Sequence, residues 1–462
     1  MKNNRYEIDM CNGPLMPKLV SFAVPLTLSN ALQLLFNAVD LIVVGRFAGS
    51  DSLAAVGATN ALINMFINLF IGVSLGANVI AARFYASGDL KKMSSAVHTS
   101  ILFALISGVF MLGVGQVLSR PALALMGTPP EILDKSALYM RIYFMGMPFF
   151  MLYNYGAAIL RAVGDTKRPM LFLVIAGLVN AGLNVFLVTA FKLDVAGVAI
   201  ATVISQIISC VLVMIVLFRS PEGYRLCFSK LRIDFAVLKN IVAIGIPAGL
   251  QSVVINFSNV ILQSSVNSFG QNAMAGYTSA NSIFGFLYSS ANSITQACMS
   301  FTSQNLGAKK YDRMRKVLLD CLILETAFEL ALGAVAFFFG EQVLGIYSSS
   351  PEVIKYGLEI LSLTTLTYFI CGYMDCIPGS LRGMGYSAVP MILSIIGTVG
   401  TRVVWIFVFF PMHRDIKFLF ISYPLSWIIT VVLQTVCYFV IRRKFKVPKT
   451  EMKTEIKTEI KT

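Results

Sequence analysis

The chain has 462 residues, of which 56% are hydrophobic and 13% are charged, and its net charge is +14. Soluble proteins carry about a quarter charged residues, and the mean hydropathy here is +0.75, so the composition excludes an ordinary soluble domain. The positive charge would fit a nucleic-acid partner, but its distribution along the chain has a simpler explanation, given below.

Long uncharged stretches follow one another along the chain, for example at 53–82, 169–191 and 195–218. A run of about 20 apolar residues crosses a bilayer as a helix, and the longer run at 240–308 is divided by a break at 269–272. We therefore expect an all-α integral membrane protein with twelve transmembrane helices arranged as two six-helix repeats. Their predicted starts lie near residues 19, 53, 94, 136, 168, 195, 238, 275, 316, 354, 388 and 417.

The first predicted helix of each half carries a proline that belongs to a repeat. Pro25 and Pro247 are 222 residues apart, and the segments 160–170 and 381–391 both begin with Leu-Arg and end with Pro-Met. Duplicated helical bundles that rock about a central site are typical of transporters. Because proline removes a backbone hydrogen bond and kinks a helix, Pro25 and Pro247 are candidate hinges; a static packing kink is the alternative.

An acidic side chain in the first predicted helix is the strongest functional candidate, because an ionisable group costs about 2.5–3.5 kcal/mol at the centre of a membrane helix. Asp40 lies at a depth similar to that of Asn180 and Asn184 in the fifth helix and Thr202 in the sixth, roughly 9–12 Å from the outer surface at 1.5 Å per residue. One carboxylate among neutral oxygens suits a proton or a sodium ion. We therefore predict a cation-coupling site at these residues, joined more weakly by Asn154 in the fourth helix. An ordinary buried polar network is the alternative.

The basic residues orient the chain. With both termini in the cytoplasm, most of the 37 lysines and arginines fall on the cytoplasmic side, which is the positive-inside rule and requires no nucleic-acid partner. We assign an N-lobe to 1–218, a cytoplasmic linker to 219–239 and a C-lobe to 240–445. The segment 446–462 repeats like charges every four residues, which opposes helix formation, so we expect a disordered cytoplasmic tail there.

The second half does not repeat the acid, because Leu262 stands at the position that corresponds to Asp40. Its seventh and eighth helices instead carry many neutral polar side chains, which suit the wall of a water-accessible cavity. Adaptable Met and aromatic residues would complete such a wall. The candidate substrate-cavity residues are Asn37, Gln251, Asn256, Asn259, Gln263 and Asn281.

Other residues that could carry chemistry give weaker signals. Glu325 and Glu329 share one face of the ninth predicted helix; lining a cavity and packing against polar partners both remain open for them. Asp375 in the tenth helix lies seven residues before Arg382 and is close enough to snorkel toward it or pair with it. The eight cysteines are scattered without a CxxC pair, so we interpret them as small packing residues, and two histidines cannot form a metal site alone. We expect no catalytic residue, no cofactor and no metal, except Na⁺ at Asp40 if sodium is the coupling ion.

Four segments recur in order along the two halves: FAVPLTLSNALQLLFNAVDLIVVGRF, LRAVGDTKRPM, GIPAGLQSVVINFSNVILQ, and SFTSQNLGA with LRGMG. In these segments, and over residues 15–445 as a whole, the chain resembles the multidrug and toxic compound extrusion (MATE) family. The resemblance implies two six-helix lobes in a V around a central cavity, with alternating access. It also implies export of amphipathic or cationic organic compounds across the bacterial inner membrane in exchange for H⁺ or Na⁺. We expect a monomer.

By motif, Asp40 resembles the essential first-helix carboxylate of that family, and Asn180, Asn184 and Thr202 match its N-lobe cation network in some members. Related members often have an aspartate where this chain has Asn184, so the choice between H⁺ and Na⁺ stays open. Another branch of the family places acids in the seventh and tenth helices. Because the seventh helix here has none and Asp375 lies about one turn from the expected place in the tenth, the C-lobe is a poor candidate for ion coupling.

Other functions fit the sequence less well. A lipid-linked oligosaccharide flippase of the same superfamily would favour arginines deep in several helices, but only Arg141 and Arg402 approach that, both near predicted helix ends. An intramembrane aspartyl enzyme would need paired acids in a motif such as GxGD, and direct ATP drive would need a P-loop; neither motif occurs in the sequence. A channel could be built from the same helices. Substrate transport without a flux of counter-ions would favour a channel over an antiporter.

Overall fold

The computed structural model describes residues 6–221 and 223–445, and these residues are mostly helical with no β-strand among them. The predicted tail at 446–462 lies outside the described residues. The short segment between the two halves contains one 3₁₀ turn at Phe228–Lys230.

The first half contributes six long helical segments. The fourth is divided, because Pro148 has no N–H to continue the hydrogen-bond ladder and the chain turns at Gly146. The segments are α1 Leu15–Val43 with a π-helical turn at Val44–Ala48, α2 Ser50–Ser87, α3 Leu90–Leu125, α4 Pro130–Met145 with α5 Met147–Ala162, α6 Lys167–Thr189 and α7 Asp194–Arg219.

The second half repeats this order with more interruptions in its last segments. The first four segments are α8 Phe235–Asn267, α9 Gln271–Gly307, α10 Tyr311–Phe338 with the short α11 Gly340–Gly345, and α12 Pro351–Thr364 continuing through a 3₁₀ turn into α13 Tyr368–Gly383. The last two are α14 Ala388–Ser394 continuing through π-helical turns and α15 Thr401–Val404 to Met412, and α16 Ile416–Phe420 with α17 Ser422–Arg442.

Ten of these segments are long and apolar enough to cross a membrane. The two others are the divided α4–α5 and the 37-residue α9, which is rich in Ser, Asn and Gly. Helix α9 packs against α1, α2, α10, α12 and α13. Because protein surrounds it, α9 can carry polar side chains that a lipid-facing helix could not.

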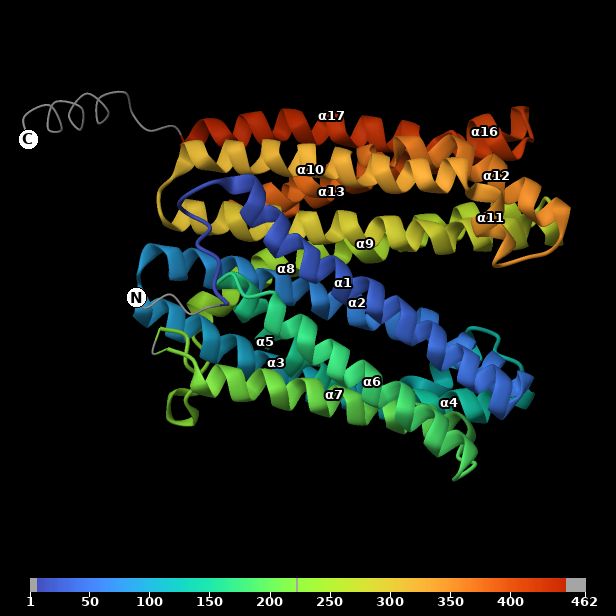
Figure 1. Cartoon of the computed structure of the whole chain (residues 1–462), viewed down its shortest axis with the longest axis horizontal. Coiled ribbons are helices and arrows are strands. Elements are labelled where there is room, and N and C mark those ends of the chain that lie inside the picture. Colours follow the sequence, from blue (N-terminus) through green and yellow to red (C-terminus); the bar gives the residue numbers. More distant parts are fainter. Residues whose placement is uncertain (1–5, 222, 446–462) are drawn as a thin grey trace, which may run out of the picture.

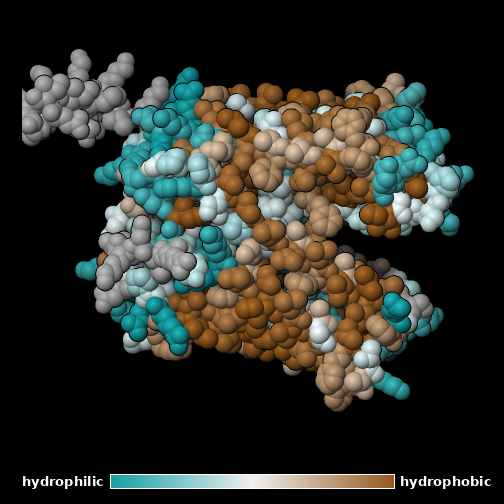
Figure 2. Space-filling model, viewed as in Figure 1, coloured by the Kyte–Doolittle hydropathy of each residue, from teal (hydrophilic) through white to brown (hydrophobic). Residues whose placement is uncertain are grey.

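The helices form two bundles, α1–α7 and α8–α17, which diverge toward one end (Figure 1). They converge at the end where α1 begins and α17 finishes; we call this the terminal end and the other the open end. Figure 2 shows the cleft between the bundles at the open end, with hydrophobic side chains over the middle of the molecule and hydrophilic ones at both ends. This distribution matches a protein that spans a bilayer.

Glycines allow the two bundles to cross closely. A Cβ atom at Gly72 or Gly76 of α2 would overlap the backbone of α8, and one at Gly245 or Gly249 of α8 would overlap the backbone of α2. Small residues at such crossings let helix backbones approach within a membrane. The α2–α8 crossing therefore joins the two bundles in the half of α2 nearer the terminal end.

Hydrogen bonds close the molecule at its terminal end. Ser300 of α9 donates to the Asn78 side chain of α2 at 2.9 Å, and Ser303 donates to the carbonyl of Val79 at 2.6 Å. Gln304 donates to the carbonyl of Ala162 at 2.7 Å. These contacts join α9 to the first bundle on the side opposite the cleft.

Residues 6–14, which we call the N-terminal strap, cross this closed end. On the side of the first bundle, Glu7 accepts hydrogen bonds from the hydroxyls of Tyr85 on α2 (2.9 Å) and Tyr224 in the segment between the two halves (2.6 Å). In the second half, Lys310 and Arg313 donate to backbone carbonyls of the strap at 3.1 and 2.7 Å. The strap therefore binds both bundles.

Both candidate hinge prolines lie inside continuous helices. Pro25 is buried in α1, and Pro247 lies in α8 between the two glycines of the crossing. The Ser29 hydroxyl donates to the Pro25 carbonyl at 2.8 Å. Neither helix is interrupted at its proline, so use as a hinge stays a prediction.

Candidate functional site

Asp40 lies four residues before α1 changes into its π-helical turn at Val44–Ala48, and its side chain is half-buried. Single π-helical turns are rare and often occur at functional sites, because the wider turn reorients side chains. Among the described residues, no lysine or arginine forms an ion pair with Asp40. Its carboxylate is therefore not neutralised by a basic side chain.

One face of α6 is shaped to receive α1. Gly177, Asn180 and Asn184 recur at helical spacing and are all buried. A Cβ atom at Gly177 would overlap the ring of Phe36 on α1. This glycine lets the two helices approach, and the approach brings the two amides beside Asp40.

The predicted residues form one hydrogen-bonded chain. The Asn184 amide nitrogen donates to Asp40 Oδ1 and, at 3.2 Å, to Asn180 Oδ1. The Asn180 amide nitrogen then donates to Thr202 Oγ1 at 3.5 Å, near the limit for a hydrogen bond. Three helices, α1, α6 and α7, thus bring Asp40, Asn180, Asn184 and Thr202 together; we call them the Asp40 network.

One atom of this network has no partner. Asn184 Oδ1 is buried and accepts no hydrogen bond among the described residues. A buried acceptor without a donor costs about 1–3 kcal/mol, so this oxygen is suited to a proton donor or a cation. Together the network offers carboxylate, amide and hydroxyl oxygens, which hard cations prefer.

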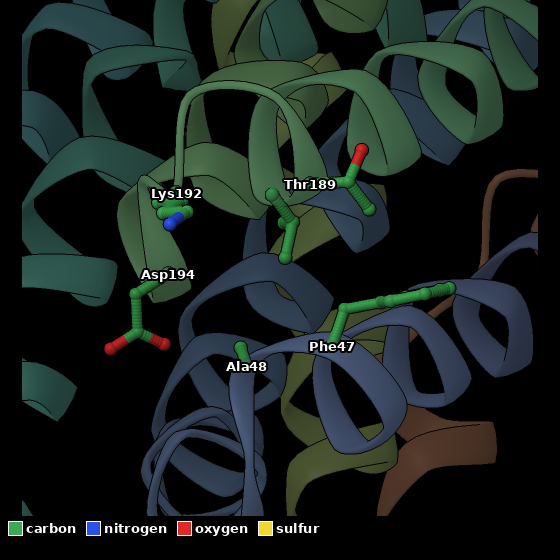
Figure 3. A pocket seen from close by; sticks show the side chains of 6 residues that line it. Phe47, Ala48, Thr189, Lys192 and Asp194 are labelled. Atoms are coloured by element: carbon green, nitrogen blue, oxygen red, sulfur yellow. The ribbon is translucent and has the colours of Figure 1, made fainter.

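A pocket opens at the ends of the same three helices. It has a volume of about 560 Å³ and is lined by Phe47, Ala48, Val188, Thr189, Lys192 and Asp194 (Figure 3). Phe47 follows Asp40 by two turns of helix, and Val188 follows Asn184 by one. The pocket therefore lies beyond the Asp40 network, toward the open end.

Asn154 is not part of this hydrogen-bonded chain. Its amide donates to the carbonyl of Phe150, one turn back on α5, at 2.8 Å. The hydroxyls of Tyr139 and Tyr143 on α4, which sequence reasoning missed, lie within electrostatic reach of Asp40. Nothing in the spacing of α4 distinguishes these tyrosines from packing residues.

The six candidate cavity residues divide into two groups. Asn37, Asn256 and Asn281 are exposed, whereas Asn259 and Gln263 are half-buried and Gln251 is buried. Gln251 accepts a hydrogen bond from Arg382 at 2.7 Å, and Asn259 accepts one from Arg402 at 2.8 Å. In this conformation those two amides bind arginines, whereas a place in the substrate cavity stays a prediction for the three exposed asparagines.

Arg402 is more deeply enclosed than its place near a predicted helix end suggested. It is only 3% exposed, donates to Ser426 at 3.3 Å, and lies over the ring of Tyr423 with its guanidinium 4.2 Å from the ring centre. Its sequence context gave one signal, since it is a lone charge within the apolar stretch that begins near 388.

The acids of the second half are also enclosed. Glu325 and Glu329 of α10 are both fully buried. Ser290 donates to Glu329 at 2.6 Å, whereas both carboxyl oxygens of Glu325 lack a partner among the described residues. The Oε2 atom of Glu325 lies against Gly372. Asp375 on α13 is half-buried.

A duplicated twelve-helix fold with a central cleft defines a class of membrane transporters. The MatE family model matches residues 25–186 and 247–408, two segments 222 residues apart. The chain therefore belongs to the MatE family and is a transporter rather than an enzyme.

Individual comparisons agree with this membership. The chain is 28% identical to the "Probable multidrug resistance protein YoeA" of Bacillus subtilis, over 89% of this chain and 91% of that protein. It is 23% identical to the "FAD transporter" of Shewanella oneidensis over 75% and 77% of the two lengths. The solved outward-facing structure of a multidrug resistance MATE family transporter matches with a TM-score of 0.89 at 21% identity, covering 96% of this chain and 99% of that one.

The fold prediction is confirmed by these findings: the protein is an all-α, multi-pass membrane transporter of the MATE architecture. The family prediction is confirmed as well. The assignment of roles to individual residues rests on the geometry described above and is argued below as a proposal.

Proposed function

We propose that the protein is an antiporter that exports amphipathic or cationic organic compounds in exchange for H⁺ or Na⁺ bound at Asp40. The observation that carries this proposal is the Asp40 network. It contains a carboxylate without a basic partner beside the unpaired Asn184 Oδ1. A group that is costly to keep charged within a membrane, and that faces an unused acceptor, is suited to take up a cation and release it.

Binding of the ion would change the hydrogen bonds between α1 and α6. A protonated Asp40 becomes a donor, and the Asn184 amide can turn over to present Oδ1 as its acceptor. Sodium would instead take oxygens from Asp40, Asn184, Asn180 and Thr202. The pocket at the open end, lined in part by Phe47, offers either ion a path from that side.

Helix α1 links this change to the other lobe. Asn30, on the same helix as Asp40, donates to Ser293 of α9 at 3.1 Å and to the carbonyl of Ser289 at 3.3 Å. A shift of α1 against α6 therefore acts on the contact between the bundles. We infer that this shift, with bending at Pro25 and Pro247, lowers the affinity for substrate in the open cleft.

The orientation follows from the same proposal. With the terminal end in the cytoplasm, the cleft faces outward and the ion reaches Asp40 from outside the cell, down its gradient. The protein would then act as a monomer in the bacterial inner membrane, with the exposed Asn37, Asn256 and Asn281 contacting substrate.

An anionic substrate, as for a flippase of lipid-linked sugars or a carrier of FAD, has less support. The guanidinium of Arg402 is bonded to Asn259 and Ser426 and covered by Tyr423, and Arg382 is bonded to Gln251. Both arginines are buried, so neither offers its charge to the cleft.

The test uses purified protein in lipid vesicles with a proton or a sodium gradient imposed separately and ethidium as substrate. Asp40→Asn should lower gradient-driven ethidium transport about 100-fold, whereas Asp320→Asn, a half-buried acid on α10 near the terminal end, should leave it unchanged. Wild-type transport by Asp40→Asn would remove the coupling role. The gradient that drives the wild type identifies the ion.

A further inference from the structure

Three cysteines that the sequence scatters over 79 positions meet inside the second lobe. Cys298 of α9, Cys321 of α10 and Cys376 of α13 have Sγ atoms that all lie within 4.8 Å of one another. Each of the three side chains is fully buried, and none is in a disulfide. We call them the thiol triad.

Close helix packing positions the triad. On α13, a Cβ atom at Gly379 would lie 3.0 Å from Thr295 of α9, and one at Gly383 would lie 2.7 Å from the carbonyl of Met299. These two glycines hold α13 against α9 beside Cys376 and Cys298. Cys321 completes the group from α10, which packs on both of these helices.

We propose that the thiol triad is a binding site for trivalent arsenic or antimony, taken up as the neutral hydroxide. Thiolates are the soft ligands that thiophilic metals and metalloids select. Three thiols from three helices, with their sulfurs close together, can bond a single such atom at once. The triad is distinct from the Asp40 network, which lies in the other lobe.

Charge favours a trivalent ligand over other thiophilic ions. Three thiolates bring three negative charges, so a monovalent ion would leave two uncompensated and a divalent ion one. Along α10, Asp320 is adjacent to Cys321 in sequence and Glu325 lies one turn away, and both side chains are acidic. Because an unpaired charge is costly in a buried site, the neutral trivalent product is preferred.

The reaction balances without an oxidant or a reductant. Arsenite at neutral pH is As(OH)₃; its three As–O bonds and three S–H bonds break, three As–S bonds form, and three waters leave. Arsenic stays trivalent. The neutral reactant has to penetrate only about 10–15 Å from the terminal end, since Cys298 and Cys376 lie nine and seven residues before their helices finish, at 1.5 Å per residue.

The test measures arsenite binding to the purified full-length protein in detergent with a phosphine reductant. Intact-mass spectrometry should show one arsenic atom per wild-type chain, with three hydrogens lost. Cys298→Ala, Cys321→Ala and Cys376→Ala should each weaken binding at least tenfold. Cys371→Ala, which removes another buried thiol from α13, should bind as the wild type does.

A second measurement does not depend on whether the variants fold. Alkylation of wild-type protein by a small membrane-permeant maleimide, mapped by peptide mass, should be blocked by arsenite at the triad and not at Cys371. Failure of folded wild-type protein to bind arsenite, or blocking that spares the triad, would overturn the proposal. Tight binding of Ag⁺ or Zn²⁺ at the triad without arsenite binding would overturn the choice of a trivalent ligand.

Discussion

The two lobes share a scaffold but place opposite charges on it. At the 222-residue offset of the two family matches, Asp40 corresponds to Leu262, Asn180 to Arg402 and Asn184 to Ile406. The first lobe thus holds an acid among amides, and the second holds a base at the place of an amide.

This difference explains why only the position of Asp40, and not that of Arg402, is suited to change its charge. A carboxylate can lose its charge by taking up a proton or sodium, whereas the guanidinium of arginine stays charged at any physiological pH. Arg402 is moreover held by Asn259, the counterpart of Asn37, and by Tyr423. Duplication therefore supplied two similar bundles, and a few substitutions gave the first an acid that a cation can neutralise and the second a base that keeps its charge.

The largest expected effect comes from placing an arginine in the first lobe, at the position that corresponds to Arg402 of the second lobe. Asn180→Arg places a guanidinium beside Asp40, and an opposite charge at short range holds a carboxylate in its charged form. Gradient-driven ethidium transport in vesicles should fall about 100-fold, while Asn180→Gln, which adds length without charge, should retain most of it. Equal transport by the two variants would contradict a titrating Asp40.

The reverse substitution, which removes the arginine from the second lobe, should lower the stability of the protein without uncoupling transport from the ion gradient. Arg402→Asn removes the hydrogen bonds to Asn259 and Ser426 and the contact with Tyr423, a loss of about 2 kcal/mol in unfolding free energy. Denaturation in detergent measures this loss. Transport per folded molecule should still respond to the gradient; an uncoupled but stable protein would show that the arginine takes part in coupling.

A second carboxyl in the Asp40 network should shift the choice of ion. Asn184→Asp adds negative charge among the same oxygens, and ligand charge tunes cation affinity, so the apparent affinity for sodium should rise about tenfold. Sodium titration of vesicle transport at fixed pH measures it. Asn154→Asp, which adds a carboxyl on α5 outside the hydrogen-bonded chain, is the matched control and should leave sodium affinity unaltered.

The smallest effect is expected at the buried acid of the second lobe. Glu325 has no hydrogen-bond partner for either carboxyl oxygen among the described residues, and a buried group of this kind avoids carrying charge. The neutral Glu325→Gln should therefore keep transport within about twofold of wild type. A loss as large as that of Asp40→Asn would mean that the second lobe binds a coupling ion as well, against the expectation drawn from its seventh helix.

Features that depend on helical spacing and depth could be predicted from the sequence. The apolar runs predict the order of the twelve helices, and residue spacing places Asn180 and Asn184 on one face of a helix at the depth of Asp40. The structure joins these residues by hydrogen bonds, because helices of similar tilt that cross the same membrane keep equal depths adjacent.

Features that depend on contacts between distant helices could not be predicted. The thiol triad forms only if α9, α10 and α13 are each rotated about their axes so that the three cysteines face one another. The positions of these cysteines in the sequence do not indicate those rotations. The enclosure of Arg402 by Asn259 and Tyr423 depends in the same way on residues far apart in sequence. The division of α4 from α5 had a local cause in Pro148, yet a proline at that position is also compatible with a simple kink.

The N-terminal strap has a consequence for how the chain is made. Its residues leave the ribosome before the helices that they join, and two of their partners, Lys310 and Arg313, are synthesised some three hundred residues later. The strap must therefore stay undocked from these two partners until the chain has been synthesised as far as α10 of the second lobe. Completion of the closed end is thus a late event in biogenesis, and a bulky fusion at the amino terminus should hinder it more than one at the carboxyl terminus.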